Sequence, residues 1–383
     1  MSHRSCNESD YIEFLLAAQT AFGCVEASRT SPAALGSVSH DAYTRLLTRR
    51  PLDTEALWNE AQRVVGQAPL QGGLLVLDDT TLDKPYSQKI ELVSRHWSGK
   101  HGRVVSGINL LSLVWTAGYT LQQSQLKHKH EAKSAEAKSA EAKSAEAKSA
   151  KAKSAEAKSA EVPLPAVVPC DFRVYDQNAD ANGQHKTKND HFRDLLQKAR
   201  ERGFAPQYVA FDSWYSGLDN LKKVRALEWL FLTRLKANRT VNLNQSGQVP
   251  VSSLCVGSQG QEVWLKGFGL VRLFQKTRPG GEVEHWITND LEMTKETWTR
   301  LALSCWAIET YHRGLKSCCG IERAQVRSAN GQKNHLLLAL RAFLRLEYQR
   351  LQNGISWYEA KLRPLRNAIQ AARTAAYKLP NTA

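Results

Sequence analysis

The sequence predicts an α/β fold, a mixed β-sheet flanked by helices, with an inserted antiparallel β subdomain and helical termini. Three observations support this fold class. Both ends of the chain show helical spacing of apolar residues, the middle contains short apolar runs that end in acidic residues, and a glycine-containing stretch of alternating polar and apolar residues precedes the last helices. Strands that alternate with helical segments are typical of a mixed sheet covered by helices.

Length and charge limit the class of protein. The chain has 383 residues, enough for two or three domains, and its 52 lysines and arginines against 37 acids give a net charge of +15. This balance predicts a polyanionic partner, nucleic acid before a membrane surface. The seven cysteines include no C-x-x-C pair, so they predict neither a disulfide framework nor a zinc site. No apolar run is long enough to cross a bilayer, which predicts a cytoplasmic protein without a membrane partner.

Residues 1–70 have the pattern of a small helical bundle. Apolar spacing predicts helices over 10–22, 39–47 and 53–65, and several arginines decorate this region. The bundle either contacts DNA or presents a solvated basic face.

The next segments predict the strands of the sheet. Residues 73–82 (GLLVLDDTTL) form an apolar run that becomes acidic, and the β-branched stretch 103–119 is long enough for two strands and a turn, which gives three neighbouring strands. The later predictions are an extended segment at 170–175, helices at 189–202 and 216–226, strands at 207–215 and 229–236, antiparallel strands within 240–288, and helices at 295–314 and 334–351.

A repeat interrupts this order. Residues 131–160 are six pentapeptides of the type EAKSA, one of which begins with Lys151. Each repeat steps about 140° around a helix, so no apolar stripe forms, and a solvated helical or disordered insertion is expected.

These patterns set the expected domain boundaries. The predicted regions are a helical N-terminal DNA-binding region (1–70), the first part of the α/β core (71–237), the β subdomain (238–290), the core helices (291–352) and a basic tail (353–383).

Three acidic positions stand out as candidates for chemistry. Asp79 and Asp212 each follow an apolar strand, where functional side chains of α/β sheets gather, although a capping or turn role is the common alternative for either alone. Glu309 lies on a predicted helix, and Lys316, two helical turns later, emerges on the same face. Convergent carboxylates on a basic protein suit Mg²⁺, because paired hard cations stabilise both the attacking and the leaving oxygen of a phosphodiester.

The motifs VLDDTTL, RHWSGKHGR, FDSWYSG, and TND with WAIETYHRGLK resemble those of bacterial insertion-sequence transposases of the DDE type. Within these the similarity is to the group whose ribonuclease-H-like core carries a β-rich insertion before the glutamate, and it runs from about residue 35 to 350. The resemblance implies that Asp79, Asp212 and Glu309 bind two Mg²⁺ ions, for which Mn²⁺ would substitute. Asp78 is the alternative first ligand, because strand alternation turns only one of the pair inward.

The resemblance also implies three DNA-binding residues. Lys316 matches the lysine that contacts a terminal phosphate, and Trp306 occupies an aromatic position near the transposon end, with core packing as its alternative. Arg313 either reaches a phosphate or pairs with Glu309. The chain departs from the family signature at Ala302 and Cys305, where a tyrosine and an arginine are expected, which leaves hairpin formation and full activity open.

The expected function is therefore cut-and-paste transposition. The enzyme would cleave DNA at terminal inverted repeats and join the ends to target DNA, as a homodimer in a bacterial, nucleoid-associated setting. A catalytically impaired relative that acts as a DNA-binding repressor, and a general metal nuclease without strand transfer, are the alternatives.

Overall fold

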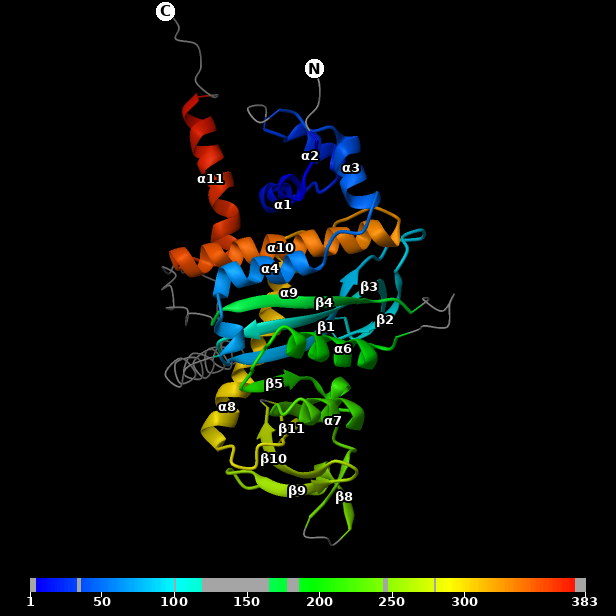
Figure 1. The fold of residues 1–383 in the computed structure, drawn as a ribbon, viewed down its shortest axis with the longest axis vertical. Helices are drawn as coiled ribbons and strands as arrows, with labels where there is room; N and C mark the ends of the chain where they lie inside the picture. The colour runs from blue at the N-terminus through cyan, green and yellow to red at the C-terminus, as the bar shows by residue number, and fades with distance from the viewer. Residues whose placement is uncertain are drawn as a thin grey trace, which may run out of the picture.

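The computed structural model describes residues 5–32, 36–99, 101–118, 165–177, 186–243, 247–278 and 280–375. The EAKSA repeat at 131–160 lies outside the described residues. Figure 1 shows a layered body in which a twisted sheet crosses the molecule, with the helices of both chain ends at the top of the view. The helices are α1 (Glu8–Ala17), α2 (Cys24–Arg29), α3 (His40–Thr48), α4 (Glu55–Val65), α6 (Lys188–Glu201), α7 (Leu218–Ala226), α8 (Lys295–Ser304), α9 (Trp306–Cys318), α10 (Ala329–Asn353) and α11 (Trp357–Ala375).

Side-chain caps fix where several of these helices begin. Ser39 accepts a hydrogen bond from the backbone of Ala42, and Ser328 does the same for Gly331 at the start of α10. At α6, Thr187 and Asp190 form a reciprocal capping box. Each cap satisfies backbone N–H groups that have no partner within the helix.

The described strands form one eleven-stranded sheet. Its strand order is β2-β3-β1-β5-β6-β11-β10-β9-β7-β8, and β4 also pairs with β3. The strands are β1 (Leu74–Asp83), β2 (Ser94–Ser98), β3 (Arg103–Thr116), β4 (Val167–Tyr175), β5 (Tyr208–Phe211), β6 (Phe231–Leu235), β7 (Thr240–Asn242), β8 (Gln248–Pro250), β9 (Gln261–Leu265), β10 (Gly269–Thr277) and β11 (Val283–Thr288).

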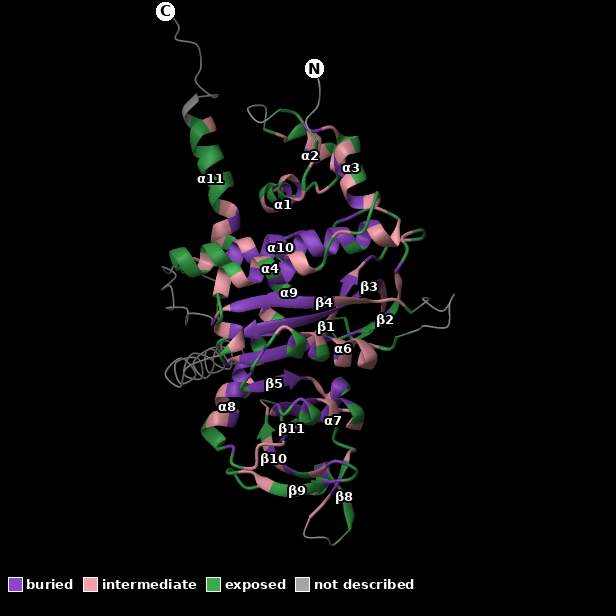
Figure 2. Cartoon of the chain, in the orientation of Figure 1, coloured by how far each residue is buried: buried purple, intermediate pink, exposed green. Residues whose placement is uncertain are grey.

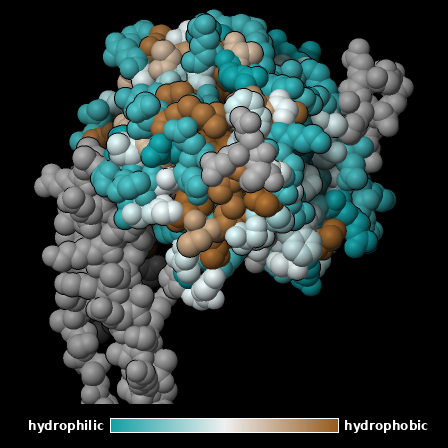
Figure 3. Space-filling view, turned by 90° about the horizontal axis from the view of Figure 1, so that it is seen from below, coloured by the Kyte–Doolittle hydropathy of each residue, from teal (hydrophilic) through white to brown (hydrophobic). Residues whose placement is uncertain are grey.

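The centre of this sheet has the ribonuclease-H-like order. Strand β3 is antiparallel to β1 and to β4, whereas β5 runs parallel to β1, and β6 runs parallel to β5. This mixed sheet confirms the fold class that the sequence predicts. Strands β7 to β11, which lie between residues 240 and 288, extend the same sheet through the pairing of β11 with β6. Figure 3 views the molecule from this end and shows apolar patches bordered by hydrophilic side chains.

Three predicted elements differ in the structure. The stretch 103–119 forms one long strand, β3, instead of two strands and a turn, because its whole length pairs with β1, β2 or β4. The predicted helix 295–314 is two helices that meet at Cys305, and the predicted helix 10–22 ends at Ala17. A continuous apolar run cannot by itself distinguish a turn from a buried strand, which explains the first difference.

Helices cover both faces of the central strands, whose residues are mostly buried (Figure 2). On one face, Phe192 of α6 packs against Phe211 of β5 with ring centroids 5.0 Å apart. On the other face, Tyr311 of α9 lies with its hydroxyl 3.5 Å from that of Ser112 on β3. The sheet therefore has an α6 face and an α9 face, and each strand residue belongs to one of them.

Helix α10 joins the N-terminal helices to the core. Its Arg341 pairs with Glu8 and Glu60, and its Asn334 donates to the backbone oxygens of Leu47 and Arg50. Among the helices that the structure describes, none combines the length and the apolar character that a bilayer-spanning segment needs.

Candidate active site

Strand register sets a row of polar side chains across the centre of the sheet. Leu77 of β1 pairs with Phe211 of β5, so the next residues, Asp78 and Asp212, are neighbours across the two parallel strands. Phe211 in turn pairs with Thr233 of β6, which aligns Asp212 with Arg234. Because residues in register share a face of a sheet, these three side chains lie on the α9 face, opposite to Phe211.

Helix α9 completes a pocket over this row. Glu309 and Trp306 come from its first turns, and the pocket also receives Ala302 and Cys305 from the end of α8 and the junction that follows. The full lining consists of Val76, Leu77, Asp78, Phe211, Asp212, Arg234, Lys276, Arg278, Glu284, Trp286, Ala302, Cys305, Trp306, Ile308 and Glu309. Three carboxylates that are far apart in the sequence thus line one cavity.

Burial disfavours the ionised form of each of these three carboxylates. Burial and the charges of Asp79 and Asp212 raise the pKa of Asp78 well above its ordinary value. Burial, with the charge of Asp79, also raises the pKa of Asp212 despite the hydrogen bond that it accepts from the Trp214 N–H. Desolvation in the pocket raises the pKa of Glu309 against the charges of nearby arginines. The pocket is therefore a place where added positive charge is stabilising.

Asp79 lies on the opposite face of β1, as strand alternation requires. Its carboxylate accepts hydrogen bonds from Lys188 (2.8 Å), Asn109 (2.5 Å) and the hydroxyl of Tyr215 (2.6 Å). Burial opposes ionisation of Asp79, but the charge of Lys188 and these bonds hold its pKa below the ordinary value. The structure brings Asp212 and Glu309 together with Asp78, and it does not bring Asp79 into that pocket.

A cationic wall faces the carboxylates. Arg234 and Arg278 both pair with Glu284, at 2.9 and 2.5 Å, and the indole N–H of Trp286 donates to the same carboxylate. Lys276 also lines the pocket, and it is exposed. Arg234 lies close enough to Cys305 for its charge to oppose the effect of burial, which raises the pKa of that thiol to about 12.

The sequence patterns missed this wall. Arg234 occurs inside the apolar strand FLTRL, where a lone charge is a usable signal, because buried charges need partners. Lys276 and Glu284 gave no such signal, since the register of β10 with β11 is what pairs them beside the pocket, and Arg278 follows the last residue of β10.

The three residues predicted to bind DNA lie at different places in the structure. Trp306 is 45% exposed at the pocket mouth, which argues against a core-packing role. Arg313 is exposed, lowers the pKa of Glu309 through its charge and forms no ion pair with it in the described chain. Lys316 donates to the backbone oxygen of Thr81 (2.7 Å) and lies 3.2 Å from Glu322, so it contacts the far part of β1 and not the pocket.

The donor set suits a hard divalent cation. Within the described residues, no group of three or more histidine, cysteine, aspartate or glutamate side chains is placed closely enough to hold a metal ion as it stands. Mg²⁺, however, keeps several waters and is commonly bound by one or two carboxylates together with substrate phosphates. The oxygen-only donors and the raised pKa values of Asp78, Asp212 and Glu309 fit such a cation.

The family profile of the DDE superfamily endonucleases matches residues 24–301. This chain belongs to that superfamily. The match includes Asp78, Asp79 and Asp212 and ends before Glu309, and it confirms the DDE part of the resemblance that the motifs indicate. Endonucleases of the DDE superfamily generally use divalent metals.

The likeness of this chain to solved structures is remote in sequence. The chain is similar to a piggyBac transposase in a synaptic complex with hairpin DNA, at 9% identity and a TM-score of 0.44, over 99% of this chain and 76% of that one. No curated protein matches the chain.

Proposed function

We propose that this DDE endonuclease is a transposase that cleaves DNA at terminal inverted repeats and transfers the freed ends to target DNA. The observation that carries the proposal is the pocket lined by Asp78, Asp212 and Glu309 beneath α9. Family membership supports endonuclease chemistry, and the +15 charge supports DNA as the partner. Asp78 replaces Asp79 as the proposed first acid, because only Asp78 shares a face with Asp212.

Each group in the pocket has a proposed task. Asp78, Asp212 and Glu309 supply oxygen ligands, and two bound Mg²⁺ ions, or Mn²⁺, would supply Lewis-acid stabilisation of the attacking and leaving oxygens. Arg234 and Arg278 would bind the non-bridging oxygens of the scissile phosphate, with Glu284 holding both guanidinium groups in place. Trp306, at the mouth, would contact the DNA end beside this phosphate.

Mn²⁺ titration followed by electron paramagnetic resonance tests the acids without requiring cleavage. Asp78→Asn, Asp212→Asn and Glu309→Gln should each weaken Mn²⁺ binding, whereas Asp79→Asn should bind it as the wild type does. Nicking of DNA that carries the sequences flanking the gene should follow the same order. If Asp79→Asn removes Mn²⁺ binding and Asp78→Asn keeps it, the assignment of the first acid is wrong.

A second candidate is an end-binding protein with impaired chemistry that represses transposition. Ala302 and Cys305 favour it, because both line the pocket at the positions where the motif resemblance implies a tyrosine and an arginine. Binding of terminal repeats without nicking, in either Mg²⁺ or Mn²⁺, would support this candidate over the transposase.

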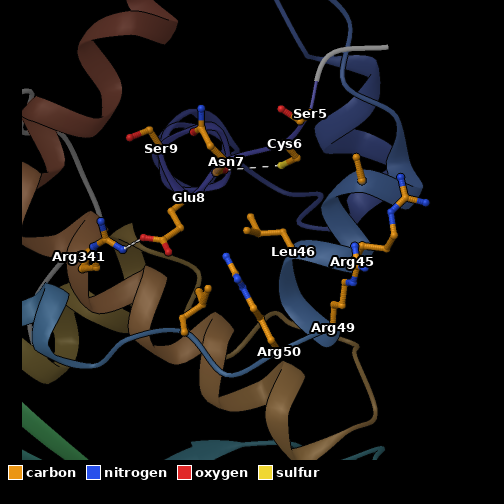
Figure 4. Close-up of a pocket in the computed structure, with 12 residues that line it drawn as sticks. Ser5, Cys6, Asn7, Glu8, Ser9, Arg45, Leu46, Arg49, Arg50 and Arg341 are labelled. Atoms are coloured by element: carbon orange, nitrogen blue, oxygen red, sulfur yellow. Dashed lines mark hydrogen bonds and ion pairs between the residues drawn. The ribbon is translucent and has the colours of Figure 1, made fainter. Parts of the chain in front are cut away.

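The N-terminal helices are the proposed DNA-binding region. A groove of about 870 Å³ lies between α1, α3 and α10, and Arg45, Arg49 and Arg50 line it (Figure 4). No ion pair involves these three arginines in the described chain, so they are available to phosphates. Arg49→Ala with Arg50→Ala should weaken duplex binding and reduce its salt slope by about one per arginine. Arg29→Ala, on the exposed face of α2, should change neither quantity.

A homodimer is also part of the proposal, and α11 is its proposed interface. This helix projects from the body of the molecule in Figure 1 and exposes Tyr358, Leu365 and Ile369. With Leu362 these residues repeat at steps of four, three and four, the apolar spacing of a two-stranded coiled coil. Leu365→Asp with Ile369→Asp should yield monomers in light scattering, whereas Ile369→Leu should leave dimers. A wild-type monomer, alone and on DNA, would exclude this interface.

A further inference from the structure

Trp214 presents a large aromatic ring to solvent from the turn that follows Asp212 of the acid pocket. The residue follows Asp212 by two positions, and 57% of its surface is exposed. Exposure alone does not define a site, because Trp264 on β9 is 53% exposed as well. The two tryptophans differ in how they are held and in what surrounds them.

The turn that carries Trp214 is fixed on both sides. Its backbone N–H donates to the Asp212 carboxylate at 2.8 Å, and the next residue, Tyr215, is buried. The Tyr215 ring stacks on Phe192 with centroids 5.2 Å apart, and its hydroxyl bonds to Asp79. An anchored turn lowers the conformational entropy that Trp214 loses when a ligand contacts it.

Two ammonium groups flank the indole ring. Lys236 Nζ lies 5.3 Å and Lys188 Nζ 6.0 Å from its centroid. Lys188 is neutralised by Asp79, whereas Lys236, just past the end of β6, is exposed and has no ion pair in the described chain. Trp264 has no cation over its ring among the described residues. An exposed ring with an adjacent free cation suits a nucleotide, because the base stacks on the ring and the phosphate binds the cation.

We propose that Trp214 stacks an unpaired DNA base next to the scissile phosphate, with the phosphate of that nucleotide on Lys236. The proposal rests on the function proposed above, since it gives the same pocket a place for a base that has left the duplex. Stacking on Trp214 would hold the strand that enters between the carboxylates and the cationic wall. The ring faces any base equally, so the site selects unpaired over paired DNA and not one sequence over another.

Binding of a single-stranded oligonucleotide containing 2-aminopurine, without divalent metal, tests the site in the full chain. Wild-type protein should quench the probe and prefer it to the same sequence in a duplex. Trp214→Ala should bind the single strand about 5- to 150-fold more weakly, the factor that corresponds to one stacked base. Trp214→Phe should recover most of the loss, Lys236→Ala should lower the salt slope, and Trp264→Ala should match wild type.

The outcomes separate this site from the proposed chemistry. Asp212→Asn should keep the quenching while it loses nicking, so a failure of the transposase proposal leaves the stacking result readable. Equal binding by wild type and Trp214→Ala would overturn the site. So would an equal loss in Trp264→Ala, which would indicate general contact of DNA with exposed tryptophans.

Discussion

Neighbouring aspartates on β1 should respond in opposite ways to loss of charge. Asp79 accepts bonds from Lys188, Asn109 and Tyr215, and its side chain and that of Lys188 are only 18% and 20% exposed. Asp79→Asn keeps one acceptor oxygen, loses the bond from the Lys188 ammonium and loses one bond from an uncharged donor. At about 1.5–3 kcal/mol for the former and about 0.5–1.5 kcal/mol for the latter, the free energy of unfolding should fall by about 2–4.5 kcal/mol.

Asp78→Asn should leave stability unchanged or increase it at neutral pH. Its carboxylate is surrounded by the charges of Asp79, Asp212 and Glu309, and each unit by which its pKa is raised corresponds to about 1.4 kcal/mol of destabilisation when it ionises. The amide removes that repulsion and also removes a proposed metal ligand. We therefore expect Asp78→Asn to be stable and to lose Mn²⁺ binding, and Asp79→Asn to be less stable and to keep it.

Urea denaturation and Mn²⁺ titration of the same samples measure both quantities. Asp194→Asn is the control, because its pair with Lys186 is exposed and should contribute less than about 1 kcal/mol. The reasoning fails if Asp79→Asn is as stable as wild type, or if Asp78→Asn is the strongly destabilised variant.

Three further predictions follow from the same geometry. The folded-state pKa of Asp78 lies above its unfolded value, so its stabilising contribution is complete below about pH 4 and is lost as pH rises through the raised pKa. In EDTA, the stability of Asp78→Asn relative to wild type should therefore increase toward neutral pH. A stability difference that does not change with pH would contradict this. Arg234→Ala should lower the rate of cleavage about 10- to 1,000-fold. Adding Cys305→Arg, which restores a guanidinium to the same wall, should recover part of this rate. Thermal denaturation of both variants would show whether unfolding causes the loss instead. Gly73→Ala should cost about 2–5 kcal/mol in unfolding experiments, because the new Cβ would clash with the Trp115 indole at a φ of +80°. Gly99→Ala, with open space around it, should be near neutral.

The sequence predicted the parts of the fold that depend on local periodicity. Ser39 marks the start of α3, and the apolar runs before Asp78 and Asp212 are the strands β1 and β5. The two helices that meet at Cys305 could not be separated by pattern, because apolar spacing continues across the junction. The length of β3 was misjudged for a related reason, since burial on both faces removes the alternation that would show a single strand.

The site was predictable only up to the choice between adjacent acids. Motif resemblance selected Asp79, and alternation left Asp78 as the alternative, but neither contains the register of β1 with β5. That register, together with Lys188 on the α6 face, is the reason that Asp79 forms an ion pair with a lysine whereas Asp78 faces the acid pocket. The cationic wall depends on the pairing of β6 with β11 and of β11 with β10, contacts that no short motif encodes.

The opposite shifts at Asp78 and Asp79 also explain how one strand can serve stability and chemistry at once. On the α6 face the negative charge is matched by Lys188, so Asp79 ties β1 to α6 and to the turn that carries Trp214. On the α9 face no ion pair to Asp78 occurs among the described residues, and burial together with the charges of Asp79 and Asp212 disfavours its ionised form, although Arg234 and Arg278 line the same pocket. Under the proposed function, a lysine paired with Asp78 would stabilise the fold and occupy the place of a metal ion. Burial and repulsion among the acids of the pocket destabilise the fold locally, and the Asp79–Lys188 pair on the opposite face of β1 offsets part of this cost. Under the proposed function, mutations that weaken the Asp79 contacts should make the free energy of unfolding depend more strongly on divalent metal.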